Sequence, residues 1–544
     1  MPHARGAYYF LWPELPVYQA DGTEVTYHPA VTVNSLPDNI FLEIFAFCLS
    51  SIPSDDMYTT KHAKKWQGLV QVCKRWQQII YGSPRYLDLH LHCSNSRING
   101  TPFLAPPEFK MLFRRNHSRW PEFPLTLEYT IYRNEIEDVD DLIAALEQPD
   151  RVHLINLTIT TSDSRADEVL QKMKVPFPAL THLKLTGPEL PYEGDDHEGI
   201  LLPRGFLGGS TPCLQHLHFN AVNATLFQEL PSLLLSARGL ISLRLEDIPD
   251  CFGYISPEEM VRGLAGLTKL RTLSINFRFF DEPPESNEGL EHNRRPGPPM
   301  YTVLPALTEF EFDGESAYLE YIAAQIDMPS VEDININYFL PGVEVHELSR
   351  FVGRTEHLGL AQFRRAQVNL HVDSAYSYIK LDHPQGERLQ VRFKLGLQIW
   401  DLEGTPELDE LVTCMGRVLG QLTALLSNVD HLSFRAQRAW RESHDRLDDS
   451  KLLPFLHLFP AVEALHVSGV LAGYIATVLE NIDEGRVTEV MPALRSLQLD
   501  GIMEAVGSPA RFLSLRRLSG HPVAIVNTDM RFSSLSDQRP IGGI

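Results

Sequence analysis

The chain has 544 residues, and its 70 acidic and 48 basic side chains give it a formal net charge of −22. At roughly 150 residues per domain, this length suits about three or four domains or one long repeat array. The content of 43% apolar and 22% charged residues excludes a chain that is disordered throughout, and the acidic balance argues against a protein that grips nucleic acid or an anionic membrane by charge.

The cysteines and the apolar runs bear on the compartment. The six cysteines are far apart and form no CxxC pair, so the sequence offers neither a disulfide framework nor a zinc motif. The apolar run at residues 7–12 is too short for a signal sequence, and no stretch reaches the length of a membrane span. We therefore expect a soluble protein of the cytoplasm or the nucleus, with reduced thiols and no membrane partner.

The first predicted elements are short helices in residues 34–90, after an irregular segment at residues 1–33. Asn34–Pro37 is typical of a helix start, and one apolar helical face follows it, formed by Ile40, Ile44, Phe45, Cys48 and Leu49. A second apolar stripe ends at residues 82–84 and contains Trp66, Leu69, Val70, Cys73, Trp76, Ile79 and Ile80. A module of this size cannot bury all the apolar surface of its own helices. It must therefore pack on the rest of the chain or on a partner.

These two segments resemble an F-box. The match consists of a Leu-Pro opening at residues 36–37, an Ile-Phe pair at residues 44–45, and a Val-Cys-Lys/Arg-x-Trp helix at residues 72–76. Between Leu49 and Trp66 the chain carries more residues than a compact F-box has. Insertions of this kind are familiar in the large sets of fungal F-box proteins that the sequence resembles.

The resemblance implies a Skp-type adaptor as partner, which would dock the module onto a cullin–RING (SCF) ubiquitin ligase. The residues that match the adaptor-binding segment of the family are Leu36, Pro37, Ile40, Ile44 and Phe45. The residues that match its core-forming helix are Val72, Cys73 and Trp76.

After a predicted connector at residues 91–150, a unit of the form apolar-x-x-apolar-x-apolar recurs along the chain. Clear copies occupy residues 178–185, 212–219, 240–245, 270–275, 305–312, 329–336, 429–434, 460–467 and 492–499. A weaker copy lies at residues 152–157, and residues 355–360 are a further candidate. The unit is the LxxLxL of leucine-rich repeats (LRR), in which each short strand stacks on the equivalent strand of its neighbour.

We therefore expect an α/β fold in which a small α-helical F-box at residues 34–90 precedes an irregular LRR-like solenoid at residues 151–530. Degenerate repeats of this kind often follow the F-box in the fungal family. Helices are predicted between the strands, at residues 226–236, 256–266, 317–326 and 408–426.

Other segments depart from the repeat. Residues 281–300 lack an apolar period and are predicted to be a disordered loop, whereas residues 367–400 alternate and predict inserted strands at 368–372, 378–381, 389–393 and 395–399. Residues 515–526 predict a helix and a closing strand, and residues 531–544 a C-terminal tail.

Alternation along each predicted strand sorts the side chains by direction. Leu183 and Leu185 should point inward, so the residues between them should reach the open, concave face by which solenoids bind proteins. Candidate target-binding residues on this face are His182, Lys184, His216, His218, Arg244, Glu311, Asn335 and His466. The charge of the face is expected to change from basic in the early repeats to acidic near residues 309–333.

Motifs of catalytic chemistry are absent from the sequence, which contains no GxxxxGK[ST], GxGxxG, HExxH or GxSxG. His182, His216 and His218 could meet on adjacent strands and hold a metal. No carboxylate or cysteine completes that site in the repeat pattern, so solvated histidines are the favoured interpretation. We expect no catalytic residue, no metal and no cofactor.

The leading hypothesis is a non-catalytic substrate receptor of an SCF-type ubiquitin ligase. Its F-box would bind the Skp-type adaptor, and its repeats would hold an unknown protein target near transfer machinery supplied by other subunits. An alternative is an LRR-type scaffold whose F-box-like helices only cap the solenoid. A third is a metalloenzyme on the histidine-bearing strands.

Overall fold

The computed structural model describes residues 35–526 with gaps at 51–68, 85, 88–90, 96, 99–100, 103–122, 133–138, 161–163, 189–199, 201, 223–225, 250–254, 279–300, 340–345, 356–362, 372–375, 383–390, 399–407, 438–448, 470 and 501–508. The predicted loop at 281–300, most of the repeat candidate at 355–360 and both predicted terminal segments lie outside the described residues. The chain divides into two compact units, of which unit 1 comprises Met1–Leu91 with Trp120–Pro124, and unit 2 comprises His92–Arg119 with Leu125–Ile544.

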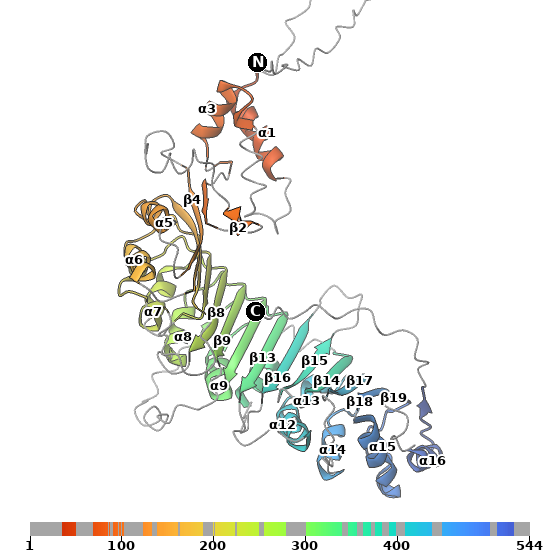
Figure 1. The fold of residues 1–544 in the computed structure, drawn as a ribbon. Helices are drawn as coiled ribbons and strands as arrows, with labels where there is room; N and C mark the ends of the chain where they lie inside the picture. The colour runs from red at the N-terminus through yellow and green to blue at the C-terminus, as the bar shows by residue number, and fades with distance from the viewer. Residues whose placement is uncertain are drawn as a thin grey trace, which may run out of the picture. The chain divides into compact units, whose positions relative to one another are not determined.

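Unit 1 contains the described helices α1 (Asp38–Ser50) and α3 (Lys74–Gly82) (Figure 1). Pro37 directly precedes α1, and its carbonyl oxygen accepts hydrogen bonds from the backbone N–H groups of Ile40 and Phe41 at 3.1 and 3.3 Å. Proline suits this place because the first N–H groups of a helix have no partner in it. Asp38 in the first turn favours the start of α1 through the helix dipole.

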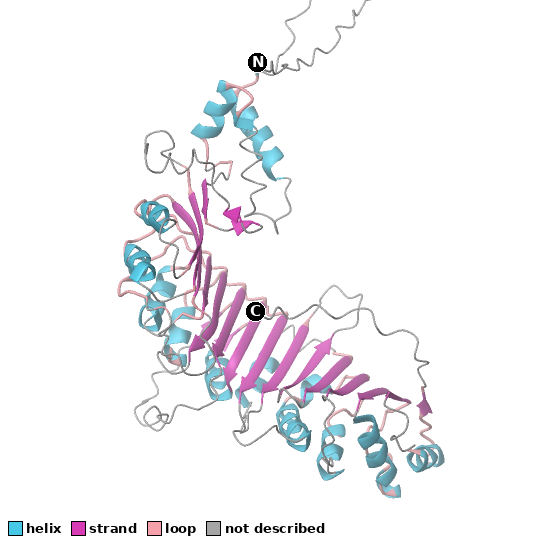
Figure 2. Cartoon of the chain, in the orientation of Figure 1, coloured by secondary structure: helices cyan, strands magenta, loops and turns pink. Residues whose placement is uncertain are grey.

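Unit 2 is a mixed α/β structure with a large, open and mostly parallel sheet (Figure 2). The order of its strands is β1 (Leu91–Ser94), β4 (Leu125–Ile131), β5 (Val152–Ile159), β6 (His182–Thr186), β7 (His216–Asn220), β8 (Ser242–Pro249), β9 (Thr272–Arg278), β11 (Glu309–Glu315), β13 (Asp333–Phe339), β16 (Arg392–Gln398), β15 (Tyr376–Asp382), β14 (Arg365–His371), β17 (His431–Gln437), β18 (Ala464–Gly469), β19 (Ser496–Asp500) and β20 (Ala524–Ile525). Two small sheets are formed by β2 (Arg97–Ile98) with β3 (Thr101–Pro102), and by β10 (Thr302–Val303) with β12 (Ile326–Asp327).

Helices alternate with these strands and cover one face of the large sheet (Figure 2). They are α5 (Val139–Leu146), α6 (Ser164–Lys172), η3 (Phe206–Gly209), α7 (Leu226–Ser236), α8 (Pro257–Leu264), α9 (Ser316–Gln325), α10 (His346–Arg354), α12 (Leu408–Gln421), α13 (Thr423–Leu426), α14 (Asp449–Leu456), α15 (Leu471–Asn481), η6 (Glu484–Arg486) and α16 (Ala510–Leu518). Successive helices pack on one another, as in α7 with α8 and α9 with α10. We call the opposite face of the sheet, on which the alternate residues of β5–β19 lie, the helix-free face.

The recurring apolar motif forms a recurring strand, as the sequence predicts. Its second apolar position is in register across six neighbouring parallel strands, at Leu183, Leu217, Leu243, Leu273, Phe310 and Ile334. All of these side chains are buried. The motif therefore builds one continuous core row between the sheet and its helices, because each strand covers the apolar face of the next.

The inserted strands β14, β15 and β16 form an antiparallel meander within the parallel sheet. β16 pairs in parallel with β13, and β14 pairs in parallel with β17, so the meander runs backwards through the strand order. The prediction of separate strands at 389–393 and 395–399 is wrong. Phe393, Leu395 and Leu397 share one buried face, so a single strand covers this alternating run.

Residues 91–150 are more than a connector, in contrast to the prediction. Strand β4 and helix α5 belong to unit 2, and β4 pairs in parallel with β5. Every second side chain of β4 is buried, namely Leu125, Leu127, Tyr129 and Ile131, but the strand lacks the LxxLxL spacing. The repeat pattern in the sequence therefore does not include it.

The C-terminal end of the described sheet has the predicted helix and closing strand. α16 is followed by β20, which extends the parallel sheet by pairing Ser496 with Ala524 and Leu497 with Ile525. None of the helices in the described part of the chain is long and apolar enough to cross a membrane.

Candidate functional site

The helices of unit 1 share an aromatic core. The ring of Trp76 on α3 lies 5.8 Å from that of Phe41 and 4.9 Å from that of Phe45, measured between centroids. Both phenylalanines are buried and one helical turn apart on α1. Phe41 was not among the predicted core residues, although its position four residues before Phe45 is the sequence signal for a shared helix face.

Arg75 on α3 connects this helix to the start of α1 by hydrogen bonds. Its guanidinium donates hydrogen bonds to Asp38 Oδ1, at 2.6 Å from Nη2 and 3.1 Å from Nε, and to the carbonyl oxygen of Leu36 at 2.6 Å. The guanidinium carbon also lies 5.0 Å from the centroid of the Phe41 ring. These contacts fix the conformation of the Leu36–Pro37 opening, which sequence reasoning assigned to adaptor contact.

The apolar residues of α1 divide between two faces. Ile40 is 40% exposed, Ile44 42% and Phe47 78%, and their spacing of four and three residues places them on one side of the helix. Pro37 is exposed and Leu36 half-buried. Phe45, predicted to face the adaptor, is only 1% exposed; one position along a helix turns the side chain by about 100°, which directs Phe45 onto Trp76.

The prediction that Val72 and Cys73 lie in a core-forming helix is also wrong. Val72 is 59% exposed and Cys73 is exposed. The physical reason is that α3 begins only at Lys74, while Cys73 is its N-terminal capping residue in an extended conformation, with φ −158° and ψ 166°. Trp76 is the residue of this motif that contacts the core.

All eight predicted target-binding residues lie on strands of unit 2 and on its helix-free face. Six of them belong to one in-register row across the sheet, which we call the central row: Lys184, His218, Arg244, Ser274, Glu311, Asn335, Lys394, Lys380, Gln367, Ser433, His466 and Gln498. His182 and His216 lie in the adjacent row.

The three candidate metal-binding histidines do not converge. The His182 and His216 rings are stacked, with centroids 4.3 Å and planes 11° apart, and burial lowers the pKa of His216. His218 instead contacts Glu246, with 2.9 Å between Nε2 and Oε2. The described residues contain no group of three His, Cys, Asp or Glu side chains arranged to hold a metal.

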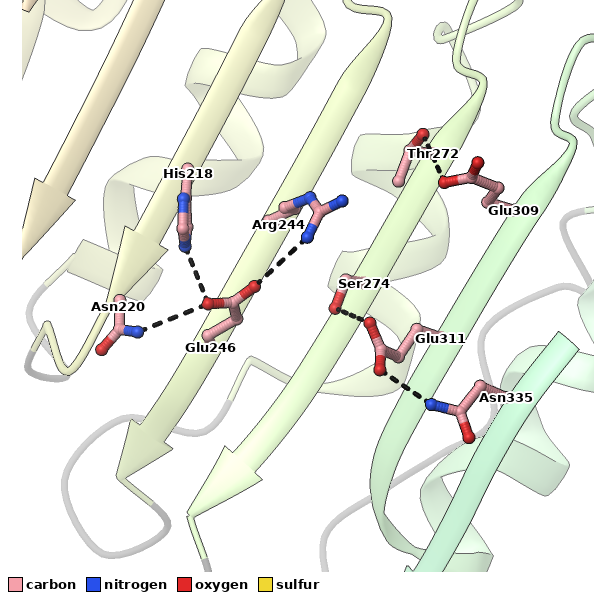
Figure 3. Close-up of polar contacts among 9 residues, drawn as sticks. All are labelled: His218, Asn220, Arg244, Glu246, Thr272, Ser274, Glu309, Glu311 and Asn335. Carbon is pink, nitrogen blue, oxygen red and sulfur yellow. Dashed lines mark hydrogen bonds and ion pairs between the residues drawn. The ribbon is translucent and has the colours of Figure 1, made fainter. Parts of the chain in front are cut away.

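Glu246 on β8 contacts several polar side chains of the helix-free face on β7 and β8 (Figure 3). Besides His218, it accepts a hydrogen bond from Asn220 Nδ2 at 3.3 Å and lies 3.8 Å from Arg244 Nη1. The contact with His218, ahead of the neighbouring charges, lowers the pKa of Glu246. The carboxylate is thus ionised, and the Arg244 guanidinium on β8 lies beside it.

The carboxylates of β11 have a different environment (Figure 3). Glu309 accepts a hydrogen bond from the Thr272 hydroxyl at 3.3 Å. Glu311 accepts from the Ser274 hydroxyl at 3.1 Å and from the Asn335 amide at 2.8 Å. Neutral donors on β9 and β13 therefore hold both side chains.

Next to β13, the meander adds an aromatic and basic group that the sequence analysis missed. The Tyr376 hydroxyl donates to Asn337 Oδ1 at 3.0 Å, and Lys394 Nζ lies 5.9 and 5.2 Å from the ring centroids of Tyr376 and Tyr378. Gly396 makes this contact possible, because a Cβ there would lie 2.1 Å from Asn337 Oδ1. The alternation of β15 and β16 was the available signal, but it does not reveal that β16 adjoins β13.

At the far end of the central row, His466 contacts Asp500. His466 Nε2 lies 2.7 Å from Asp500 Oδ2, and Gln498 Nε2 donates to the same oxygen at 3.0 Å. His466 is therefore oriented by its neighbours on β19.

Comparison with known families finds no family model that matches the chain, and a search of curated proteins finds no match.

Proposed function

We propose that the chain is a non-catalytic substrate receptor of an SCF-type ubiquitin ligase. Unit 1 is then an F-box that binds the Skp-type adaptor, and unit 2 is an LRR-like solenoid that recruits a protein target. The observation that carries the proposal is the apolar side of α1, where Ile40 and Ile44 remain exposed one helical turn apart.

An exposed pair of large apolar side chains on a small helical module marks a protein contact. Full burial of an isoleucine side chain contributes about 1.5–3 kcal/mol relative to full exposure. A partner that covers the exposed parts of Ile40 and Ile44 would gain a fraction of this free energy at each residue. The aromatic core of Phe41, Phe45 and Trp76 holds α1 from its other side. The apolar side is thus presented on a firm support, as a binding interface requires.

The polar helix-free face of unit 2 supports the second half of the proposal. Its strands repeat in parallel and display in-register polar rows, an arrangement by which repeat proteins bind extended partners. The mechanism is proximity, since a bound target would be held near the ubiquitin-transfer machinery of other subunits. Such a receptor works in the cytoplasm or the nucleus, with the cullin–RING assembly as its indirect partner.

The test is complex formation between the purified full chain and a purified Skp-type adaptor, followed by size-exclusion chromatography. We expect a stable complex with the wild type and its loss in the double variant Ile40→Asp, Ile44→Asp. A matched control changes two exposed apolar residues of unit 2, Val175→Asp and Leu235→Asp, and should still bind. A wild type that does not bind, or an unaffected double variant, would refute the proposal.

An LRR-type scaffold whose unit 1 helices only cap the solenoid remains the second candidate. It gains support from the same repeated strands but requires no adaptor. The adaptor experiment separates the two.

A further inference from the structure

Several carboxylates on the helix-free face lie beside a basic side chain. A Lys, Arg or His nitrogen lies within 4.0 Å of each of these described side chains: Glu246, Asp333, Asp382 and Asp500. Three of the four carboxylates of β11 differ, and we call Glu309, Glu311 and Asp313 the β11 acid row. Among the described residues, none of the three forms an ion pair; each accepts hydrogen bonds only from hydroxyl or amide groups.

Neutral donors orient the β11 acid row without cancelling its charge. Thr272 and Ser274 approach from β9, and Asn335 and Asn337 from β13. The side chains are therefore fixed in place while the charges of Glu309 and Glu311 stay available to a cation from outside, which is how complementary charges give a protein interface its specificity.

Two acceptor atoms of the same region lack a donor. Asp313 Oδ1 and Asn335 Oδ1 are buried and accept no hydrogen bond from the residues that the structure describes. A buried acceptor without a donor costs free energy. The donors of β9 and β13 therefore leave part of the acceptor capacity of this region unfilled.

The geometry of the row favours an extended occupant. Its members are alternate residues of one strand, so their side chains repeat about every 6.8 Å along β11. Alternate side chains of an extended peptide repeat at the same distance. Lysines or arginines at every second position would therefore match the carboxylates one to one.

The meander sets one border of the acidic region. Lys394 on β16 lies over the rings of Tyr376 and Tyr378 and is directly opposite Lys380 on β15. Two cations side by side disfavour a third. A basic segment would thus be confined to the strands from β9 to β13.

We propose that the β11 acid row binds an extended basic segment of the target protein, with lysine or arginine at alternate positions. The inference rests on the proposed role of unit 2 in recruiting a target and adds the chemistry of the segment that it recognises. The polar groups of β9 and β13 serve as positioning residues for the three carboxylates.

Two labelled heptapeptides of identical composition test this proposal on the full chain. One is acetyl-Gly-Lys-Ser-Lys-Ser-Lys-Gly-amide, and the other has its lysines adjacent, acetyl-Gly-Ser-Lys-Lys-Lys-Ser-Gly-amide. Fluorescence anisotropy at 0.15 M salt, where the Debye length is about 8 Å, compares their affinities. We expect the alternating peptide to bind about fivefold more tightly, as ion pairs of a few tenths of a kcal/mol each at successive carboxylates allow.

Charge-neutral variants locate the binding. The triple variant Glu309→Gln, Glu311→Gln, Asp313→Asn should lose the preference for the alternating peptide. A control with the same change in net charge, Asp167→Asn, Glu259→Gln, Glu410→Gln, alters exposed acids of α6, α8 and α12 and should keep it. Circular dichroism checks that both variants fold, and the single variant Glu311→Gln replaces the triple variant if that one does not.

Three results would overturn the proposal: equal affinity of the wild type for both peptides, a preference that survives in the triple variant, or a preference that the control loses as well. Adaptor binding is measured separately through Ile40 and Ile44. If the adaptor does not bind while the peptide preference is found, the ligase assignment fails and the β11 site stands. The reverse pattern would reject the β11 site alone.

Discussion

His182 on β6 and His216 on β7 stack ring on ring, with their centroids 4.3 Å apart. The Thr181 hydroxyl lies 2.8 Å from His182 Nδ1, and Ser242 is in register with His216 on its other side. Burial of the His216 ring lowers its pKa and therefore couples the stability of the early strands to pH.

Replacement of His216 should reduce this pH dependence. Burial lowers the folded-state pKa of His216 below its ordinary value of 6.5, so the unfolded chain binds the proton more readily. The free energy of unfolding should then fall as the pH decreases through the range between 6.5 and the lowered value. His216→Asn should lose stability less steeply between pH 7.5 and 5.5, measured by urea unfolding, whereas His521→Asn at an exposed site should behave like the wild type.

For Asp313 we predict the opposite pH dependence of the free energy of unfolding. Burial raises the pKa of Asp313 from 3.8 to about 7, with Glu311 and Asp247 adding to the rise and Asn337 and Lys394 opposing it. The ionised carboxylate therefore destabilises the fold above pH 7, and this effect disappears as the pH falls toward 3.8. Asp313→Asn should raise the free energy of unfolding by about 1–3 kcal/mol at pH 8 and by little at pH 4. An equal gain at both pH values would contradict this account.

The two faces of α1 should respond differently to alanine. Phe45→Ala removes a buried ring from the contact with Trp76 and should cost about 3–5 kcal/mol. Ile44→Ala removes a side chain that is already 42% exposed and should cost about 1 kcal/mol or less. Hydrogen exchange of the α1 and α3 amides in the full chain measures both, and similar exchange rates in the two variants would reject the assigned faces.

Gly396 should tolerate no larger residue. In Gly396→Ala, the new Cβ would approach Asn337 Oδ1 to 2.1 Å and the Tyr376 hydroxyl to 2.8 Å, so this hydrogen bond must break or the strands must shift. We expect a loss of about 1–3 kcal/mol in stability.

Gly353→Ala is the matched control for that substitution. Gly353 lies in α10 with no atom within 4 Å of the added Cβ, and alanine there should stabilise by about 0.5–1 kcal/mol. Thermal unfolding of both variants makes the comparison, and a neutral Gly396→Ala would show that the Asn337–Tyr376 contact is not maintained.

The repeated strands were predictable because a short apolar motif recurs with one buried side. Leu183 and Leu217 identify their strands locally, and alternation then assigns His182 and His218 to the helix-free face. The order of the meander was not predictable, because alternation in β16 carries no information about which strand lies beside it. Lys394 and Tyr376 therefore went unnoticed, although they lie close to Asn337.

In unit 1 the sequence identified the helices more accurately than their faces. The motif placed Val72 and Cys73 in a helix, but α3 begins only at Lys74, and both residues are exposed. Phe41 and Arg75 were missed for a related reason, since their importance comes from contacts between α1 and α3 that lie more than thirty residues apart in sequence. Periodicity describes one helix at a time and does not reveal such pairs.

In the proposed function, α1 carries the adaptor-binding surface of a ligase receptor. Hydrogen exchange of the full chain, measured with and without a saturating Skp-type adaptor, tests it most directly. We predict slower exchange on addition of the adaptor at the amides of residues 38–50, with no change in strands β6–β19. Unchanged exchange in α1, or protection confined to the helix-free face, would contradict the account.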